Sequence, residues 1–253
     1  IGFDPNLFTK KTLSLFFGKS KCEYKSLENN LIDEIWKRKI KQNKNKFFVL
    51  PERSVSKKYQ VKINKVVNYL KKTKSDYIFI TASENNAWLL NIRGRDTKYT
   101  PIPYSYVLID KKKNIKFFCD QNKLSKPLKN FFNNCANVLS SIKKKNFIID
   151  KSSCSFLLED IIRKNNRILN FNDPIYFFKA IKGKQEIKNM KEAHIYDGVA
   201  LTKYLLWLKK NFHKKSINEI SASKKLFEFR KRNKKFRFSS FPTISGTGPN
   251  AAL

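Results

Sequence analysis

Histidine and cysteine, which often bind metal ions or act in catalysis, are rare in this sequence, with two and four residues. The two histidines, His194 and His213, fall in helical segments, and no carboxylate stands at a spacing that would complete a metal site with either of them. The four cysteines form no Cys-x-x-Cys pair and have no histidine nearby at ligand spacing. The residues therefore favour packing or solvent contact for both histidines and a reduced, cytoplasmic setting for the thiols.

Two further stretches have the composition of a binding site. The turn Gly-Thr-Gly at 246–248 could cradle a phosphate, but no Gly-Lys-Ser/Thr follows it, so a plain turn is the better interpretation. Residues 224–238 (KKLFEFRKRNKKFRF) hold eight basic residues to one glutamate, with phenylalanines between them, as in some sites for single-stranded nucleic acid. The phenylalanines also fit the buried face of a helix that runs into a strand, and we favour that structural interpretation.

The elements that must position such residues alternate along the chain. Apolar residues at helical spacing predict helices at 27–39, from Ser56 as N-cap through Leu70, at 121–132 and at 153–165. Short apolar runs predict strands at 47–51, 77–81, 87–92, 104–110, 115–119, 146–150 and 167–171. Helices that alternate with strands and strand pairs indicate an α/β (α+β) domain with a mixed sheet over residues 51–178.

The pattern changes after Pro174. Residues 179–212 show one long helical pattern in which apolar residues recur on a single face. Ser216 stands three residues before Glu219, which is the spacing of a capping box, so a second helix should begin there.

Charge is the strongest compositional signal. The 253 residues contain 54 basic and 20 acidic side chains, a formal net charge of +34, which raises nucleic acid or an acidic surface as a partner. The excess is spread over residues 1–50 (+6), 51–178 (+15) and 179–253 (+13), and it consists mostly of lysine. Together with the many asparagines and isoleucines, this suits a genome rich in A and T. We therefore prefer compositional drift to a nucleic-acid site.

One constellation in the last third of the chain resembles a known family. It consists of Lys182, Glu186, Met190, Ala193, His194, Asp197, Gly198 and Ala200 at fixed spacing, then Trp207, then NEISASK at 218–224 and SFPTISGTGPNAA at 240–252. This set closely resembles the start of the catalytic domain of Xaa-Pro aminopeptidase (aminopeptidase P), in the creatinase and methionine aminopeptidase superfamily. IGFDPNLF with LENNLIDEIW resembles the end of that family's first domain, and SENNAWLLNIRGRD with PYSYVLI resembles its second domain.

The resemblance implies a three-domain enzyme. Residues 1–50 would end its first N-terminal domain, 51–178 would form its second, non-catalytic creatinase-type α/β domain with flanking helices, and 179–253 would begin a pita-bread peptidase domain. The family uses two divalent metal ions, usually manganese, and a metal-bridging hydroxide to release the N-terminal residue from peptides with proline second. We expect a cytoplasmic homodimer when the protein is full length, with no membrane segment and no nucleic-acid partner.

In this family the catalytic histidine and the metal ligands follow the Asn-Ala-Ala triplet. We therefore expect the chain to be a fragment that has no catalytic residue, holds no metal ion and is inactive by itself. The acidic residues of the last third match no ligand position, and we assign them to helix faces and caps: Glu186, Glu192, Asp197, Glu219 and Glu228.

The stretch 238–250 precedes the missing histidine closely enough to contribute to the substrate site. It should supply strands that wall the pocket for the substrate's amino terminus, with Phe238, Phe241 and Gly246 as candidate wall residues. Ordinary strand packing explains the two phenylalanines slightly better.

Some alternatives stay open. The loop that contains Arg93, Arg95 and Asp96 is a partner-subunit or substrate-approach loop, or else a polar turn held by an ion pair. The parent protein could be a superfamily relative that hydrolyses a non-peptide substrate or serves only in interactions. A basic nucleic-acid-binding protein is the third alternative, and the one that the sequence favours least.

Overall fold

The computed structural model describes residues 1–36, 44–124, 135–213 and 217–251. The chain forms two compact units, which are described separately below. Unit 1 consists of Ile1–Glu52, Lys57–Asp96 and Pro101–Ile181, and unit 2 of Arg53–Ser56, Thr97–Thr100 and Lys182–Leu253. Within the described residues, no helix combines the length and the apolar character needed to cross a bilayer.

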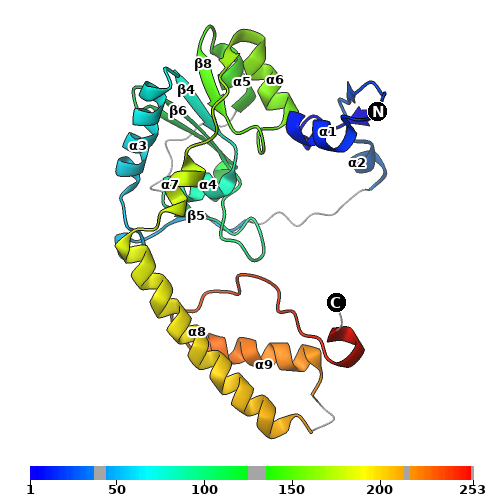
Figure 1. Ribbon diagram of the computed structural model, residues 1–253, viewed down its shortest axis with the longest axis vertical. Helices are drawn as coiled ribbons and strands as arrows, with labels where there is room; N and C mark the ends of the chain where they lie inside the picture. The colour runs from blue at the N-terminus through cyan, green and yellow to red at the C-terminus, as the bar shows by residue number, and fades with distance from the viewer. Residues whose placement is uncertain (37–43, 125–134, 214–216, 252–253) are drawn as a thin grey trace. The chain divides into compact units, whose positions relative to one another are not determined.

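Unit 1 is built on a five-stranded mixed sheet of order β7-β6-β4-β8-β9 (Figure 1). Its strands are β4 (Tyr77–Ile80), β6 (Tyr106–Asp110), β7 (Ile115–Phe118), β8 (Asn146–Ile149) and β9 (Arg167–Ile168). The central strand β4 is antiparallel to β6 and parallel to β8, with Tyr77 opposite both Asp110 and Phe147. β6 and β7 form an antiparallel hairpin, and β9 is parallel to β8. The mixed sheet expected from the sequence is confirmed.

Helices cover both faces of this sheet because side chains of β4 alternate between two cores. Ile78 and Ile80 lie in the first core with α3 (Tyr59–Lys72), α4 (Ser83–Leu89) and α7 (Ile175–Ala180). Phe79 lies in the second core with α5 (Cys135–Ser141) and α6 (Phe156–Asn165). All three side chains are fully buried, so a shift of one residue in β4 would exchange the two cores.

Shorter elements complete unit 1. They are β1 (Gly2–Phe3), α1 (Lys10–Phe17), β2 (Lys25–Ser26), α2 (Leu31–Ile35), β3 (Phe48–Val49), β5 (Ile92–Arg93) and the 3₁₀ turn Gln121–Lys123; a second 3₁₀ turn, Glu52–Ser54, joins the units. β1 pairs with β2 and β3 with β5. The sequence pattern missed α1, whose start is capped by the side chain of Thr9.

Several local expectations are wrong. The run 87–92 is not a strand, because α4 continues to Leu89 and only β5 follows; a short apolar run does not distinguish a buried helix from a strand. The N-cap of α3 is Lys58, whereas the Ser56 hydroxyl accepts the backbone N–H of Glu186 at 3.2 Å. The helices expected at 27–39 and 121–132 are seen only as α2 and a 3₁₀ turn, and the rest of each range lies partly outside the described residues.

The described part of unit 2 contains the helices α8 (Lys184–Asn211) and α9 (Glu219–Lys231) and the 3₁₀ turn Gly248–Ala251. Asp197 of α8 accepts two hydrogen bonds from the guanidinium of Arg230 in α9, at 2.6 and 3.0 Å. The cap of α9 is Asn218, whose side chain accepts the N–H of Ser221, whereas the expected cap Ser216 lies outside the described residues. No strand forms over 238–250, contrary to expectation, since a strand needs a paired neighbour and the described part of unit 2 contains none.

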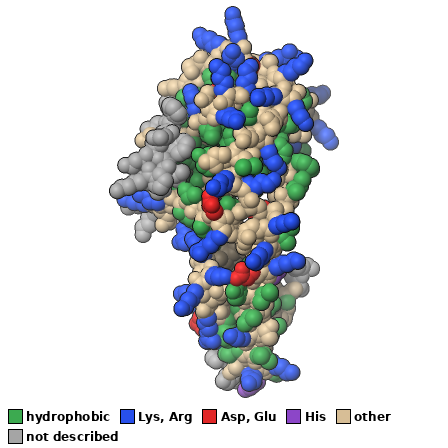
Figure 2. All heavy atoms as spheres, turned by 90° about the vertical axis from the view of Figure 1, so that its left-hand side faces the viewer, with side chains coloured by type: hydrophobic (Ala, Val, Ile, Leu, Met, Phe, Trp, Pro, Cys, Tyr) green, Lys and Arg blue, Asp and Glu red, His purple; other side chains and the backbone are tan. Residues whose placement is uncertain are grey.

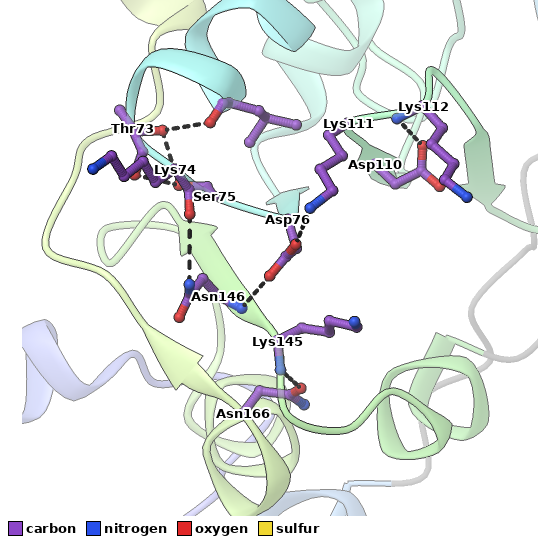
Figure 3. A network of polar contacts seen from close by, with 11 residues as sticks. Thr73, Lys74, Ser75, Asp76, Asp110, Lys111, Lys112, Lys145, Asn146 and Asn166 are labelled. Atoms are coloured by element: carbon purple, nitrogen blue, oxygen red, sulfur yellow. Dashed lines mark hydrogen bonds and ion pairs between the residues drawn. The ribbon is translucent and has the colours of Figure 1, made fainter.

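The edge of the sheet at which β4, β8 and β9 begin, here called the amino edge, is held by a polar network (Figure 3). One carboxylate oxygen of Asp76 accepts a hydrogen bond from the Lys111 ammonium at 2.7 Å. The other carboxylate oxygen accepts one from the backbone N–H of Asn146 at 3.0 Å. Asp110 accepts the N–H groups of Lys112 and Asn114 at 2.8 and 2.9 Å. Asp76 thereby joins three chain connections, and Asp110 closes the hairpin in which it lies.

Three of these connections contain a lysine in the left-handed backbone conformation. The φ angles are +52° at Lys74, +73° at Lys113 and +55° at Lys144. A residue with a Cβ loses about 1 kcal/mol or more in this region, and glycine or asparagine is favoured there. The lysines at these turns are therefore held by the surrounding hydrogen bonds rather than by their own preference.

We expect replacement of Asp76 by alanine to destabilise unit 1 by about 1–3 kcal/mol, because a backbone N–H and an ammonium lose their acceptor. Burial raises the pKa of Asp76, but the Asn146 N–H and the Lys111 ammonium outweigh it, and the net pKa lies below its ordinary 3.8. The stabilisation is therefore present at neutral pH and is lost as the pH falls below that ordinary value. Urea unfolding at neutral pH measures the effect. Glu28→Ala, an exposed glutamate, is the control, and equal stabilities of the two variants would contradict the prediction.

Candidate binding site

A hollow of about 480 Å³ opens at the other edge of the sheet, the carboxyl edge, where β4 and β8 end. Its size falls within the range of small-molecule sites, and ligands of open α/β sheets commonly bind outside the carboxyl ends of the strands. It is lined by residues that follow β4 or β8, precede or begin β6, end or follow β7, or begin α5: Thr81, Ser83, Tyr104, Ser105, Tyr106, Phe118, Cys119, Cys135 and Ser153. Hydroxyl groups and aromatic rings make up most of the wall.

The hydroxyl groups of this wall continue into a buried network around Asp150. Ser153 and Tyr176 each donate to Oδ2 of Asp150 at 2.8 Å, and the backbone N–H of Ser152 donates to Oδ1 at 2.9 Å. Because Ser153 uses its proton on Asp150, the Thr81 hydroxyl must donate to Ser153, 2.6 Å away. Asp150 thus serves as an acceptor that orients the wall, and its three donors leave it poorly placed to act as a base.

A second buried acid, Asp173, precedes α7 and is hydrogen-bonded to Asn85 of α4. Its Oδ1 accepts the N–H of Ile175 at the start of α7, and its Oδ2 accepts the amide of Asn85, both at 2.8 Å. The carbonyl oxygen of Asn85 in turn accepts the ammonium of Lys179 at 2.5 Å. Burial raises the pKa of Asp173 to about 6, although both hydrogen bonds act to lower it.

The two asparagines of the SENNAW stretch explain how α4 is fixed. Asn85 reaches Asp173, and the neighbouring Asn86 donates to the carbonyl oxygen of Ser105 at 2.7 Å, which holds the entry of β6 beside the hollow. Both side chains are completely buried. The sequence alone assigned these asparagines no role, and the signal that could have identified them was a pair of asparagines directly before the apolar run Ala87–Leu90.

The two thiols that line the hollow, Cys119 and Cys135, are poor nucleophiles at neutral pH. Burial raises the pKa of both Cys119 and Cys135 to about 12, so both are protonated at neutral pH and neither is a ready nucleophile. Asp150 already accepts three hydrogen bonds, so the lining of the hollow that the structure describes has the composition of a binding surface.

The predicted substrate-pocket residues lie in unit 2. Phe238 is half-buried, Phe241 is 60% exposed and Gly246 is exposed, all in a segment without regular structure. A Cβ on Gly246 would stand 2.6 Å from the carbonyl oxygen of Asn250, so the turn requires glycine there. Glu219 accepts the N–H of Thr247 at 2.7 Å and so ties this turn to the start of α9. A role as pocket wall stays a prediction.

The other candidates of the sequence analysis make structural contacts. His194 is exposed and its ring nitrogen lies 2.9 Å from the carbonyl oxygen of Met190, and His213 is also exposed. Each acid of unit 2 has a local partner: Glu186 the N–H of Gly183, Glu192 the ammonium of Lys235, Asp197 Arg230, Glu219 Thr247 and Glu228 Lys225.

Two residues of the loop that contains Arg93, Arg95 and Asp96 bind residues outside it. Asp96 pairs with the ammonium of Lys123 at 2.6 Å and accepts the N–H of Tyr104 at 2.7 Å. Arg93 donates to the carbonyl oxygen of Ala87 near the end of α4 at 2.8 Å, which stabilises that helix end. These contacts favour a turn held by an ion pair, although its partner Lys123 lies outside the loop.

The described residues do not fit the two metal ions that the resemblance implies. In this part of the chain, no three or more His, Cys, Asp or Glu side chains come together in a way that could hold an ion. The acids of unit 2 are instead used in the local contacts described above. No step of a metal-assisted reaction can therefore be assigned to these residues.

Comparison with known proteins decides the family. The sequence profile of the creatinase/prolidase N-terminal domain matches residues 38–186, more than half of the chain. The chain belongs to this family. The creatinase/prolidase match contains the whole mixed sheet and the helices that cover it.

Relatives extend the similarity to the full chain. A protein of Paracoccidioides lutzii named "Probable Xaa-Pro aminopeptidase P" is 33% identical over 100% of this chain and 46% of its own length. A protein of the same name from Leptosphaeria maculans is 29% identical over the same shares. The crystal structure of an X-prolyl aminopeptidase from Caenorhabditis elegans, described as a cytosolic enzyme with a di-nuclear active site, matches 99% of this chain with a TM-score of 0.85 and 25% identity. The chain spans about half the length of these relatives, 46% in each case.

The raised pKa of Asp173 predicts a pH-dependent stability. The unfolded chain releases this proton near pH 3.8 and the folded protein near pH 6, so the folded state binds more protons in between and loses stability as the pH rises through that window. Asp173→Asn removes this titration, so the stability difference between wild type and variant should shift by roughly 2–3 kcal/mol between acid and neutral pH. Denaturant unfolding at several pH values measures it. Asp33→Asn, at an exposed position, is the control, and a pH-independent difference for Asp173→Asn would refute the assignment.

Proposed function

We propose that this chain is a fragment of a metal-dependent aminopeptidase that releases the first residue from peptides with proline second. The whole-chain similarity carries the proposal: relatives named Xaa-Pro aminopeptidase P align with all of it, and the Caenorhabditis elegans enzyme shares its fold over 99% of its residues. The similarity includes both units, so it extends beyond the creatinase/prolidase domain, which occurs at residues 38–186.

The proposal assigns the chain a supporting part in that enzyme. Residues 1–50 would end a first domain, 51–178 would form a second, non-catalytic domain, and 179–253 would begin the peptidase domain. The reaction would use two divalent metal ions, expected to be manganese, bound by residues other than those described here. The chain alone would then be inactive, and Phe238, Phe241 and Gly246 would contribute only to the wall of the substrate pocket.

The substrate preference has a physical basis in the peptide itself. An X-Pro bond has no N–H, and the proline ring fixes φ near −65°, so a peptidase cleft that binds the amide hydrogen of its substrate cannot use it. A pocket shaped for the pyrrolidine ring removes this obstacle. By analogy with the cytosolic Caenorhabditis elegans enzyme we place the full-length protein in the cytoplasm, and we propose that it forms a homodimer.

The test is to express the longer reading frame that contains this chain, add Mn²⁺ and measure release of the first residue. An X-Pro peptide should be cleaved at least about tenfold faster, by kcat/KM, than an X-Ala peptide of the same length. The 253-residue chain alone, under the same conditions, should cleave neither. Equal rates on the two peptides would contradict the specificity, and activity of the short chain would contradict the assignment of the chemistry to other residues.

A further inference from the structure

The amino edge of the sheet carries a concentration of positive charge. Residues 71–74, 111–113, 143–145 and 163–167 each contain three lysines or arginines, and all of these basic side chains are exposed; the four segments together are called the basic rim. Lys and Arg side chains (blue) project from the top of the view in Figure 2. Within the described residues, only Lys111 and Arg163 of the basic rim take part in ion pairs.

The strand register brings these four segments together. The hairpin 110–114 joins β6 and β7, and the other three segments lead into β4, β8 and β9 at the same edge. Adjacent strands lie about 4.8 Å apart, so the five strands spread the basic rim over roughly 19 Å. Backbone hydrogen bonds join neighbouring segments, from Lys111 to Asp76, from Asp76 to Asn146 and from Lys144 to Asn165, at 2.9–3.1 Å.

Uniform drift toward lysine does not explain the basic rim, because the opposite edge of the same sheet lacks it. The segments at the carboxyl edge, 81–84, 103–105, 119–121, 150–154 and 169–173, contain a single basic residue, Lys151, and four acidic ones. The net charges of residues 1–50, 51–178 and 179–253 conceal this contrast, since both edges consist of residues from the same range, 51–178. Segments rich in basic residues alternate along the sequence with segments that have few, and the fold places the two kinds at opposite edges of the sheet.

The left-handed turns give a second argument. Asparagine codons are as rich in A and T as lysine codons, and asparagine is the favoured residue after glycine at positive φ. Three turns of the basic rim nevertheless carry lysine there, at Lys74, Lys113 and Lys144. Codon composition therefore does not account for the choice of residue at these positions, whereas a requirement for positive charge does.

The residue types of the basic rim indicate which class of anionic partner it can bind. Residues 71–76, 110–114, 142–146 and 163–167 contain no aromatic residue, so they offer no surface on which unpaired bases could stack. Their only apolar side chain, Ile142, is half-buried, so nothing there would insert into a lipid surface. Exposed lysine ammonium groups are the groups that contact the phosphates of a duplex without reading its sequence.

We propose that the basic rim binds the phosphate backbone of double-stranded nucleic acid. The contact is independent of sequence and of the peptidase chemistry proposed above. It depends on closely spaced ammonium groups that the hydrogen-bonded connections hold at one edge of the sheet.

The test uses the wild-type protein and the triple variant Lys74→Asn, Lys113→Asn and Lys144→Asn. Asparagine suits the left-handed conformation of all three positions, so the charge is removed while the turns are kept, and thermal unfolding should show stability equal to wild type or higher. Binding to a short DNA duplex and to an RNA duplex of the same sequence is measured by fluorescence anisotropy over a series of salt concentrations. The triple variant should bind about tenfold or more weakly, with a log–log salt slope smaller by about 2–3.

The matched control removes three exposed lysines of α8 instead: Lys191→Gln, Lys203→Gln and Lys209→Gln. It has the same net charge as the triple variant and should bind like wild type, with a salt slope changed by less than about 1. Equal losses in the two variants would show a diffuse charge effect and overturn the proposal. Absence of duplex binding, or tighter rim-dependent binding to phosphatidylserine vesicles or to polyglutamate, would overturn it as well. Preference between the DNA and RNA duplexes identifies the form that is bound.

Discussion

The pairing of β4 with two neighbours of opposite direction is the constraint on which unit 1 depends. Antiparallel pairing with β6 adds a hairpin on one side, and parallel pairing with β8 requires a crossover on the other. The alternating side chains of β4 then divide the interior into two cores, each covered by its own helices. Because one strand fixes both the order of the sheet and the two cores, it also decides which chain connections meet at each edge.

The two edges have opposite character as a result. At the carboxyl edge, Asp150 and Asp173 are buried acceptors for hydroxyl, amide and backbone donors. At the amino edge the two acids, Asp76 and Asp110, are used to tie the connections together, and lysines point outward around them. The carboxyl edge therefore has a hollow lined by uncharged side chains, and the amino edge has a cluster of exposed lysines and arginines.

Much of unit 1 could be predicted from the sequence because its strands are short apolar runs bounded by polar turns. β4, β6, β7 and β8 each lie within an expected range, and α3 and α6 follow the expected periodicity. The α4 region could not be predicted in this way, because its polar residues Asn85 and Asn86 are buried. Their hydrogen-bond partners Asp173 and Ser105 are distant in sequence. The buried networks around Asp150 and Asp173 were missed because each includes a partner that is distant in sequence, Tyr176 for Asp150 and Asn85 for Asp173.

We expect the described residues to supply a framework for the proposed aminopeptidase, with its metal ions bound by other residues. Isothermal titration with Mn²⁺ tests this most directly, with the chain and the full-length protein compared at neutral pH. The account predicts two ions bound by the full-length protein and none bound stoichiometrically by residues 1–253 alone. Stoichiometric binding of Mn²⁺ by the short chain, or its absence from the full-length protein, would contradict the account.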